Sequence, residues 1–367
     1  MNYTSEDILN ALRHVDDPDL HKDLVSLNMI SNIVVEQGKV SFKLTLTTPA
    51  CPLKEKIKND CIKAIQQYVN ADMKVEIDID ANVTSLRNTN VNVLPSVKNI
   101  ICVASGKGGV GKSTVAVNLA LSLARTGAKV GLIDADIHGP SIPTMLGVKG
   151  KKPEIRLIKE KHFMVPLEAE GIKLLSIGLL VDERQAIVWR GPMVTSALRQ
   201  FVTDCIWGKL DYMIVDMPPG TGDVHITVAQ TLNVTGAVIV TTPQEVALAD
   251  ARKALAMFRL DSINVPILGI VENMAYFTPE ELPDNKYYIF GKGGGQKMAD
   301  EYEVPLLGQI PLVQSIREGG DTGKPVSIYG RDNIQVTEAF DEIAENVARQ
   351  VAIKNASFAP EKQKSIL

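Results

Sequence analysis

The residues best suited to chemistry form one glycine-rich run: Ser105-Gly106-Lys107-Gly108-Gly109-Val110-Gly111-Lys112-Ser113-Thr114. Its spacing, G-x-x-x-x-G-K-[S/T], is typical of a loop that binds nucleotide phosphates. Glycines lack a Cβ, so successive backbone N–H groups can converge on an anion. We expect Lys112 to place its charge on the β- and γ-phosphates and the Ser113 hydroxyl to ligate Mg²⁺. The run also carries a second lysine, Lys107, directly after its first glycine.

The flanking segments must position this loop, and their patterns agree with that task. Residues 100–104 are apolar and largely β-branched, as in a buried parallel strand. The segment from Val115 predicts a helix that ends near Gly127. Strand, loop and helix therefore follow in the order that aims a helix N-terminus at an anion. The alternative, a glycine-rich turn with a chance lysine, leaves these flanks unexplained.

Two further predicted strands end in acidic residues. Asp134 and Asp136 end one strand, and Asp216 ends another, followed by Met-Pro-Pro-Gly220. Side chains at the carboxyl ends of parallel strands lie where such sheets bind ligands. We expect Asp216 to serve the Mg²⁺ site, Asp136 to orient the attacking water, and the Gly220 N–H to contact the γ-phosphate. Any one of these aspartates by itself could simply cap a helix or end a strand in solvent.

Composition and charge exclude several classes of protein. The 367 residues suggest two or three domains, and 45% hydrophobic with 22% charged residues is typical of a globular chain. A net charge of −4 argues against non-specific nucleic-acid binding as the main role. No apolar run is long enough for a stable membrane insertion, and the N-terminus lacks a signal-peptide pattern. The expected location is the cytoplasm.

The periodicity predicts an α/β chain with a small N-terminal α+β domain (1–81), a linker (82–95), a large domain (96–354) and a polar C-terminal tail (355–367). In the small domain, Ser5 is the predicted cap of a first helix, and Pro52 opens a second. In the large domain, alternating strands and helices predict a mostly parallel sheet covered by helices on both faces. Its expected strands are 100–104, 130–134, 172–176, 212–216, 238–242, 267–271 and 306–310, with a last helix over 336–351.

Seven motifs support a family resemblance. They are SGKGGVGKST at Ser105–Thr114, DADIHGPSIP at Asp134–Pro143, WRGPM at Trp189–Met193, DMPPGTGD at Asp216–Asp223, VENM at Val271–Met274, FGKGGG at Phe290–Gly295 and SIREGGDTGKP at Ser315–Pro325. With them the chain resembles the Mrp/ApbC-like iron–sulfur cluster carrier ATPases. These are deviant P-loop NTPases, grouped with MinD, ParA and the nitrogenase iron protein. The small domain, through the stretch Thr47–Leu53, resembles a domain of iron–sulfur maturation factors.

The resemblance implies further roles and partners. Lys107 would reach across a homodimer to the partner's ATP, Asp136 would serve the attacking water, and Asp216 would serve Mg²⁺. Asn273 matches the position that reads the adenine edge, for which a side-chain amide has both a donor and an acceptor. A strand-end cap is an equally good interpretation of Asn273. Iron–sulfur apoproteins and assembly factors are the implied partners.

The cysteines depart from the family pattern. Many members carry a C-x-x-C between VENM and FGKGGG that is thought to hold a bridging cluster, such as a [4Fe-4S] cluster, whereas residues 275–289 contain no cysteine. Cys61, Cys102 and Cys205 fit buried structural positions. Cys51 precedes Pro52 and is predicted to lie at a helix N-cap, where the helix dipole would lower the pKa of its thiol. Cys51 is therefore either a reactive thiol that contacts a cluster or a plain helix-start residue.

The sequence favours a weak Mg²⁺-dependent ATPase that delivers iron–sulfur clusters to apoproteins. A positioning ATPase of the MinD or ParA type is one alternative, although the segment 358–364 is a poor match to a basic amphipathic membrane helix. A nucleotide-stabilised adaptor without enzymatic function is another, and the missing C-x-x-C makes it more credible.

Overall fold

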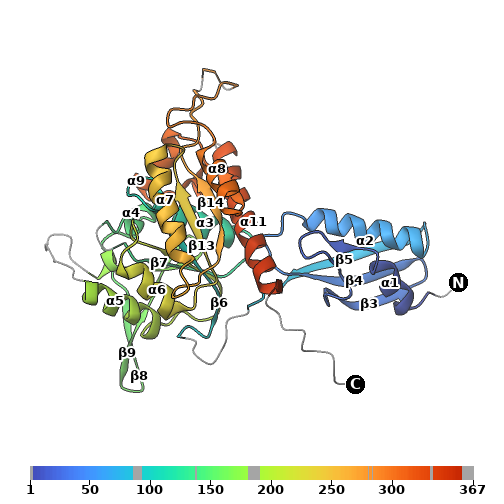
Figure 1. Cartoon of the computed structure of the whole chain (residues 1–367). Helices are drawn as coiled ribbons and strands as arrows, with labels where there is room; N and C mark the ends of the chain where they lie inside the picture. Colours follow the sequence, from blue (N-terminus) through green and yellow to red (C-terminus); the bar gives the residue numbers. More distant parts are fainter. Residues whose placement is uncertain are drawn as a thin grey trace. The chain divides into compact units, whose positions relative to one another are not determined.

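An eight-stranded sheet forms the centre of the larger part of this computed structural model (Figure 1). The structure describes residues 3–85, 93–136, 139–180, 191–279, 281–282, 284–330 and 334–357. Of these, the residues up to 85 and those from 348 onward form one compact unit, and the residues between form a second. Among the described helices, none is long and apolar enough to cross a bilayer.

The strands of the large sheet are β6 (Val97–Ala104), β7 (Val130–Asp134), β10 (Leu167–Ala169), β11 (Ile172–Ser176), β12 (Leu210–Asp216), β13 (Gly236–Thr241), β14 (Ile267–Glu272) and β15 (Leu306–Gln309). They lie in the order β10-β11-β7-β12-β6-β13-β14-β15, and all neighbours are parallel except β10 with β11. The predicted mostly parallel sheet is confirmed, and each of the seven predicted strands is present. Among the described strands of this sheet, β10, a three-residue edge strand, is the one that was not predicted.

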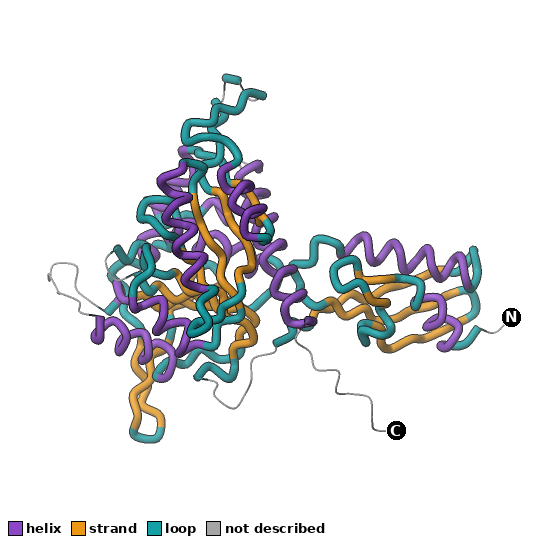
Figure 2. Tube along the Cα trace, viewed as in Figure 1, coloured by secondary structure: helices purple, strands orange, loops and turns teal. Residues whose placement is uncertain are grey.

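Helices cover both faces of this sheet (Figures 1 and 2). They are α3 (Lys112–Arg125), α4 (Ile142–Met145), a 3₁₀ turn (Ile177–Leu179), α5 (Gly191–Thr203), α6 (Asp223–Leu232), α7 (Glu245–Phe258), α8 (Gly294–Tyr302), α9 (Gln314–Thr322), α10 (Val326–Tyr329) and α11 (Ile334–Ser357). Ile100, Cys102 and Ala104 of β6 share a buried cluster with side chains of α5, α6, α7 and α8. Helix α3 contributes nothing to that cluster and packs against β6, β7 and β12, so it lies on the opposite face.

A hairpin of β8 (Glu154–Ile158) and β9 (Lys161–Val165) projects from the large unit (Figure 1). Its turn is made by Lys159 and Glu160, both with positive φ. The sequence analysis did not predict it. Every side chain of β8 is exposed, so the strand lacks the alternation of buried and exposed positions on which such predictions depend.

The small unit contains β1 (Asp16–Asp17), β2 (Lys22–Asp23), and a sheet of β3 (Ile30–Glu36), β4 (Lys39–Leu46) and β5 (Lys74–Ala81). Strands β3 and β4 are antiparallel, whereas β4 and β5 are parallel. The parallel pair requires a crossover, which α2 (Lys54–Tyr68) supplies. Helix α1 (Ser5–Leu12) and α2 bury Ile8, Leu12, Ile57 and Ile65 with the inner face of β4.

Both predicted helix starts in the small unit are wrong. Thr4, not Ser5, caps α1, because its hydroxyl accepts the N–H of Asp7 while the Asp7 carboxylate accepts the N–H of Thr4. Helix α2 begins at Lys54 after a turn, with Leu53 at its N-cap, so Cys51 is not the cap residue.

The last helix, α11, extends to Ser357 and includes the first three residues of the predicted tail. Its end is held by Asn355, a 5% exposed residue whose Nδ2 donates to the carbonyl of Thr84 at 2.8 Å. The remainder of the tail, 358–367, lies outside the described residues, as do residues 86–92 of the predicted linker.

Candidate functional site

The glycine-rich loop lies between the end of β6 and the start of α3, as the sequence predicted. Gly111 has a φ of +83° and packs so closely on Asn273 that a Cβ would lie 2.1 Å from its Nδ2. Gly106 packs on the backbone of Asp250 in α7, 2.0 Å from where its own Cβ would stand. Only glycine fits either position without displacing a neighbour.

The N-terminus of α3 has no side-chain cap. Its N-cap residue is Gly111, which has no side chain to accept a hydrogen bond from the first turn. The free N–H groups and the positive end of the helix dipole together favour an anion at this point.

Three charged side chains converge directly behind the loop. Lys112 Nζ lies 2.7 Å from Asp216 Oδ1 and 3.5 Å from Asp136 Oδ2. Ser113 Oγ donates to Asp216 Oδ2 at 2.5 Å. Lys112 and Asp216 are 6% and 0% exposed, so this is a buried ion pair. Lys112, predicted to bind phosphate, and Ser113, predicted to bind Mg²⁺, are thus both hydrogen-bonded to Asp216, which was also predicted to serve the Mg²⁺ site.

Asp216 and Asp136 differ in how many of their carboxylate oxygens accept hydrogen bonds. Asp136 Oδ1 is buried and makes no hydrogen bond within the described part of the chain. Burial raises the pKa of Asp216, although Lys112 and Ser113 act against that rise. One hydroxyl and two carboxylates form an all-oxygen donor set, which is what a hard cation such as Mg²⁺ prefers. Within this donor set, Asp136 Oδ1 remains able to accept a hydrogen bond from a ligand or a water molecule.

Asp134 and Ser176 belong to the site, and the sequence analysis did not assign a role to either. Asp134 is fully buried, accepting the Ser176 hydroxyl at 2.8 Å and the backbone N–H of Asp136 at 3.1 Å. Burial, followed by repulsion from Asp216, raises the pKa of Asp134 to about 8. Asp134 lies deeper than Asp136 and orients it by accepting its backbone N–H. The paired acids in the DAD motif could have pointed to Asp134, whereas nothing near Ser176 in the sequence marks it.

Gly220 lies beside the loop, and Lys107 is part of it. The Gly220 N–H donates to the carbonyl of Ser105 at 2.9 Å. Lys107 is half-buried, and its ammonium has no ion-pair partner among the described residues. Residues 137, 138, 189 and 190, which fall within two of the motifs, lie outside the described part of the chain.

A cavity of about 380 Å³ opens beside the loop and has the size of a ligand site. Its lining includes Gly111, Thr114, Asn273, Pro311, Val313 and Ile316. The Asn273 amide donates to the carbonyl of Val110 at 2.8 Å, which holds the amide against the loop. Its oxygen and second N–H remain for a ligand in the cavity.

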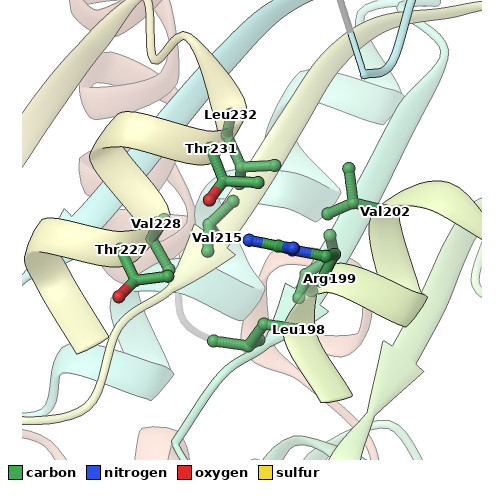
Figure 3. Close-up of a pocket in the computed structure, with 9 residues that line it drawn as sticks. Leu198, Arg199, Val202, Val215, Thr227, Val228, Thr231 and Leu232 are labelled. Atoms are coloured by element: carbon green, nitrogen blue, oxygen red, sulfur yellow. The ribbon is translucent and has the colours of Figure 1, made fainter. Parts of the chain in front are cut away.

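A second hollow lies between α5 and α6 (Figure 3). It is lined mainly by apolar side chains, with Arg199, Thr227 and Thr231 among them. Its interior volume, about 10 Å³, leaves room for about one water molecule, so it cannot accept a nucleotide.

The cysteines do not gather at one place. Burial raises the pKa values of Cys61, Cys102 and Cys205 to about 12, which disfavours their thiolates. Cys51 is half-buried against the core of the small unit, two residues before the N-cap of α2. Among the described residues, no group of three or more His, Cys, Asp or Glu side chains could hold a metal ion.

Two family models match the chain. Residues 96–348 match the ParA model, described as NUBPL iron-transfer P-loop NTPase. Residues 5–79 match a model described as iron-sulfur cluster assembly protein. Together they span most of both units.

Curated relatives match almost the full length. An iron-sulfur cluster carrier protein of Synechocystis sp. is 49% identical over 351 residues, covering 95% of this chain and 98% of the relative. One of Escherichia coli K12 is 41% identical over 345 residues, covering 94% and 91%. A solved nucleotide-binding protein from Archaeoglobus fulgidus, in complex with ADP, is 38% identical with a TM-score of 0.54, covering 62% of this chain and 88% of its own.

Proposed function

This chain belongs to the iron–sulfur cluster carrier family of P-loop NTPases, as its motifs predicted, and from that premise we propose how its residues serve the role. The protein binds ATP with Mg²⁺, hydrolyses it slowly, and uses the two nucleotide states to acquire and deliver iron–sulfur clusters. It acts as a homodimer in the cytoplasm, and its partners are apoproteins and assembly factors.

The observation that carries the nucleotide part is the cluster of Lys112, Ser113, Asp136 and Asp216 beneath an uncapped helix N-terminus, in which the three charged side chains are buried. Lys112 would exchange its bond to Asp216 for the β- and γ-phosphates, where its charge is most useful. Ser113 and Asp216 would hold Mg²⁺, which neutralises charge on the phosphate oxygens when bound.

Hydrolysis needs an oriented water and a stabilised leaving group. Asp136, with one buried carboxylate oxygen unpaired, would accept a hydrogen bond from the attacking water. The water oxygen forms a bond to the γ-phosphorus while the bond from that phosphorus to the β,γ-bridging oxygen breaks, leaving ADP and phosphate. Lys107, half-buried and without an ion-pair partner among the described residues, would neutralise phosphate charge across the dimer.

The cavity beside the loop would hold the nucleoside. Phosphates on residues 106–114 leave the base near Asn273 and the apolar side chains of Pro311 and Val313. With one N–H committed to Val110, the amide retains an oxygen and an N–H for the adenine edge.

The cargo is the iron–sulfur cluster, and the ligands for it differ from the family pattern. Residues 275–289 supply no cysteine, so the bridging site of other members is missing here. Among the four cysteines, Cys51 is one of two that are not fully buried, and burial raises the pKa of the other, Cys205, to about 12. We therefore propose Cys51 as the thiol that contacts the cluster. A second candidate function is a non-enzymatic adaptor, and the absence of a C-x-x-C pair from residues 275–289 favours it.

Anaerobic reconstitution with iron and sulfide tests the carrier role. The wild-type protein should gain cluster absorbance and pass the cluster to an apoferredoxin. Cys51→Ser should lose both, whereas Cys205→Ser, a half-buried cysteine elsewhere in the chain, should retain both. A wild-type protein that gains no absorbance yet hydrolyses ATP would favour the adaptor. Full transfer by Cys51→Ser would exclude Cys51 as the cluster contact.

A further inference from the structure

His225 is a buried imidazole that the proposed reaction leaves unused. It lies in the first turn of α6 and is 1% exposed, and neither of its ring nitrogens forms a hydrogen bond with any residue that the structure describes. Its ring stands edge-on to Phe258, with centroids 6.5 Å apart. An unpaired buried donor is costly, so in a native structure it calls for an explanation.

The surroundings of His225 connect it to the loop 217–222, between Asp216 and α6. Its backbone N–H donates to the carbonyl of Gly222 at 3.0 Å. Burial lowers the pKa of its imidazole, while the backbone carbonyls of Gly222 and Pro218 act in the opposite direction. These carbonyls lie near the ring, but neither is aligned with a ring nitrogen in hydrogen-bond geometry. Lys112 and Asp136 also influence the ring electrostatically. A neutral imidazole offers one N–H donor, and the carbonyls of this loop are the acceptors beside it.

The same loop carries the Gly220 N–H, which here donates to the carbonyl of Ser105. That N–H cannot serve Ser105 and a γ-phosphate fully at once. Pro218 lies two residues before Gly220 in the same loop, and its carbonyl lies near the His225 ring. The ring of His225 is therefore placed to gain a partner in the arrangement that Gly220 would adopt for hydrolysis.

We propose that His225 is a positioning residue for ATP hydrolysis, whose ring N–H holds the carbonyl of Pro218 when Gly220 faces the γ-phosphate. The inference rests on the proposed nucleotide function. It adds a two-state element. In the state seen here Gly220 is paired with Ser105, and the Pro218 carbonyl lies near the His225 ring without a well-formed hydrogen bond; in the other state Gly220 leaves Ser105 and that hydrogen bond forms. An ordinary packing residue at this position would have no need for a polar ring.

The experiment compares His225→Leu, which has similar bulk but no donor, with His225→Gln, which restores an N–H donor. Thr231→Val, also on α6 but lining the hollow of Figure 3, is the matched control for removal of a polar group. The readouts are kcat and KM for ATP, thermal unfolding, and hydrogen–deuterium exchange of 217–232 with ATPγS against ADP.

We expect His225→Leu to be at least as stable as wild type, because it removes an unpaired polar group. Its kcat should fall by about tenfold with little change in KM, the loss expected for one hydrogen bond made only in the reactive state. It should also lose the extra protection that ATPγS gives to 217–222. His225→Gln should recover most of both, and Thr231→Val should behave as wild type.

Wild-type kcat and protection in His225→Leu would overturn the proposal. If that variant does not fold, His225→Gln and the shorter His225→Asn decide, because only glutamine should reach the loop; equal activity of the two would refute the role. Failure of the proposed function itself would be distinguishable, since the wild-type protein would then neither bind nor hydrolyse ATP.

Discussion

Replacement of Lys112 by alanine is the most decisive perturbation of this protein, because the structure predicts two separate losses from it. The ammonium lies 2.7 Å from Asp216, and both groups are almost fully buried. Removing one partner of a buried ion pair leaves an uncompensated charge, which typically costs about 3–5 kcal/mol. Against a total stability of about 5–15 kcal/mol, that loss should be plain in urea unfolding.

The second loss is in nucleotide affinity. A hydrogen bond to a charged group contributes about 1.5–3 kcal/mol, so ATP should bind about 10- to 150-fold more weakly. Fluorescence titration with a labelled ATP analogue in Mg²⁺ measures this change. Lys107→Ala is the matched control, since Lys107 has no ion-pair partner among the described residues and should unfold as wild type does.

Adding Asp216→Asn to Lys112→Ala separates the two effects. The second substitution removes the negative charge of Asp216 that Lys112→Ala leaves buried and unpaired, so the double variant should regain stability while its nucleotide affinity stays low. If Lys112→Ala unfolds and binds ATP as the wild type does, the reasoning about this site is refuted. If the double variant is less stable than the single one, the buried pair is not the source of the loss.

Three further outcomes follow from the same site. Gly111→Ala should lose nucleotide binding and at least about 1–2 kcal/mol of stability, because φ at this position is positive and a Cβ would lie 2.1 Å from Asn273 Nδ2. Urea unfolding measures the stability and nucleotide titration the binding. Wild-type values in both would contradict so close an approach of Asn273 to the loop. Asn273→Ala should reduce the preference for ATP over GTP by about tenfold in competition binding, the value of one lost hydrogen bond, and an unchanged ratio would leave Asn273 as a structural cap. The pKa of Asp134 is raised to about 8, so its neutral form is favoured in the fold, and its contribution to stability is lost as pH rises from about 4 toward 8. Asp134→Asn should remove that component, which amounts to at most about 1.4 kcal/mol per pH unit, and equal slopes in the two proteins would count against a raised pKa.

The elements that carry the site were accessible to sequence reasoning. Strands β6, β7 and β12 are largely buried on both faces, so each contains an apolar run that ends in a polar residue or a glycine-rich loop. The loop itself is a contiguous motif whose glycines meet local backbone requirements. The exposed hairpin of β8 and β9 and the start of α2 were missed or misplaced, because turn geometry decided them and no burial pattern did.

The sequence by itself determined the nucleotide loop, the succession of the large sheet's main strands along the chain, and the family, since each is encoded by residues close together in the chain. Only the tertiary structure decided that Lys112 pairs with Asp216, 104 residues away, and that Ser176 anchors Asp134. It also decided that the His225 ring is buried without a hydrogen bond to any described residue, and that Cys51 is not a helix cap. The physical reason is that neighbouring parallel strands bring their carboxyl ends together, and burial there sets the charge and pairing of each side chain.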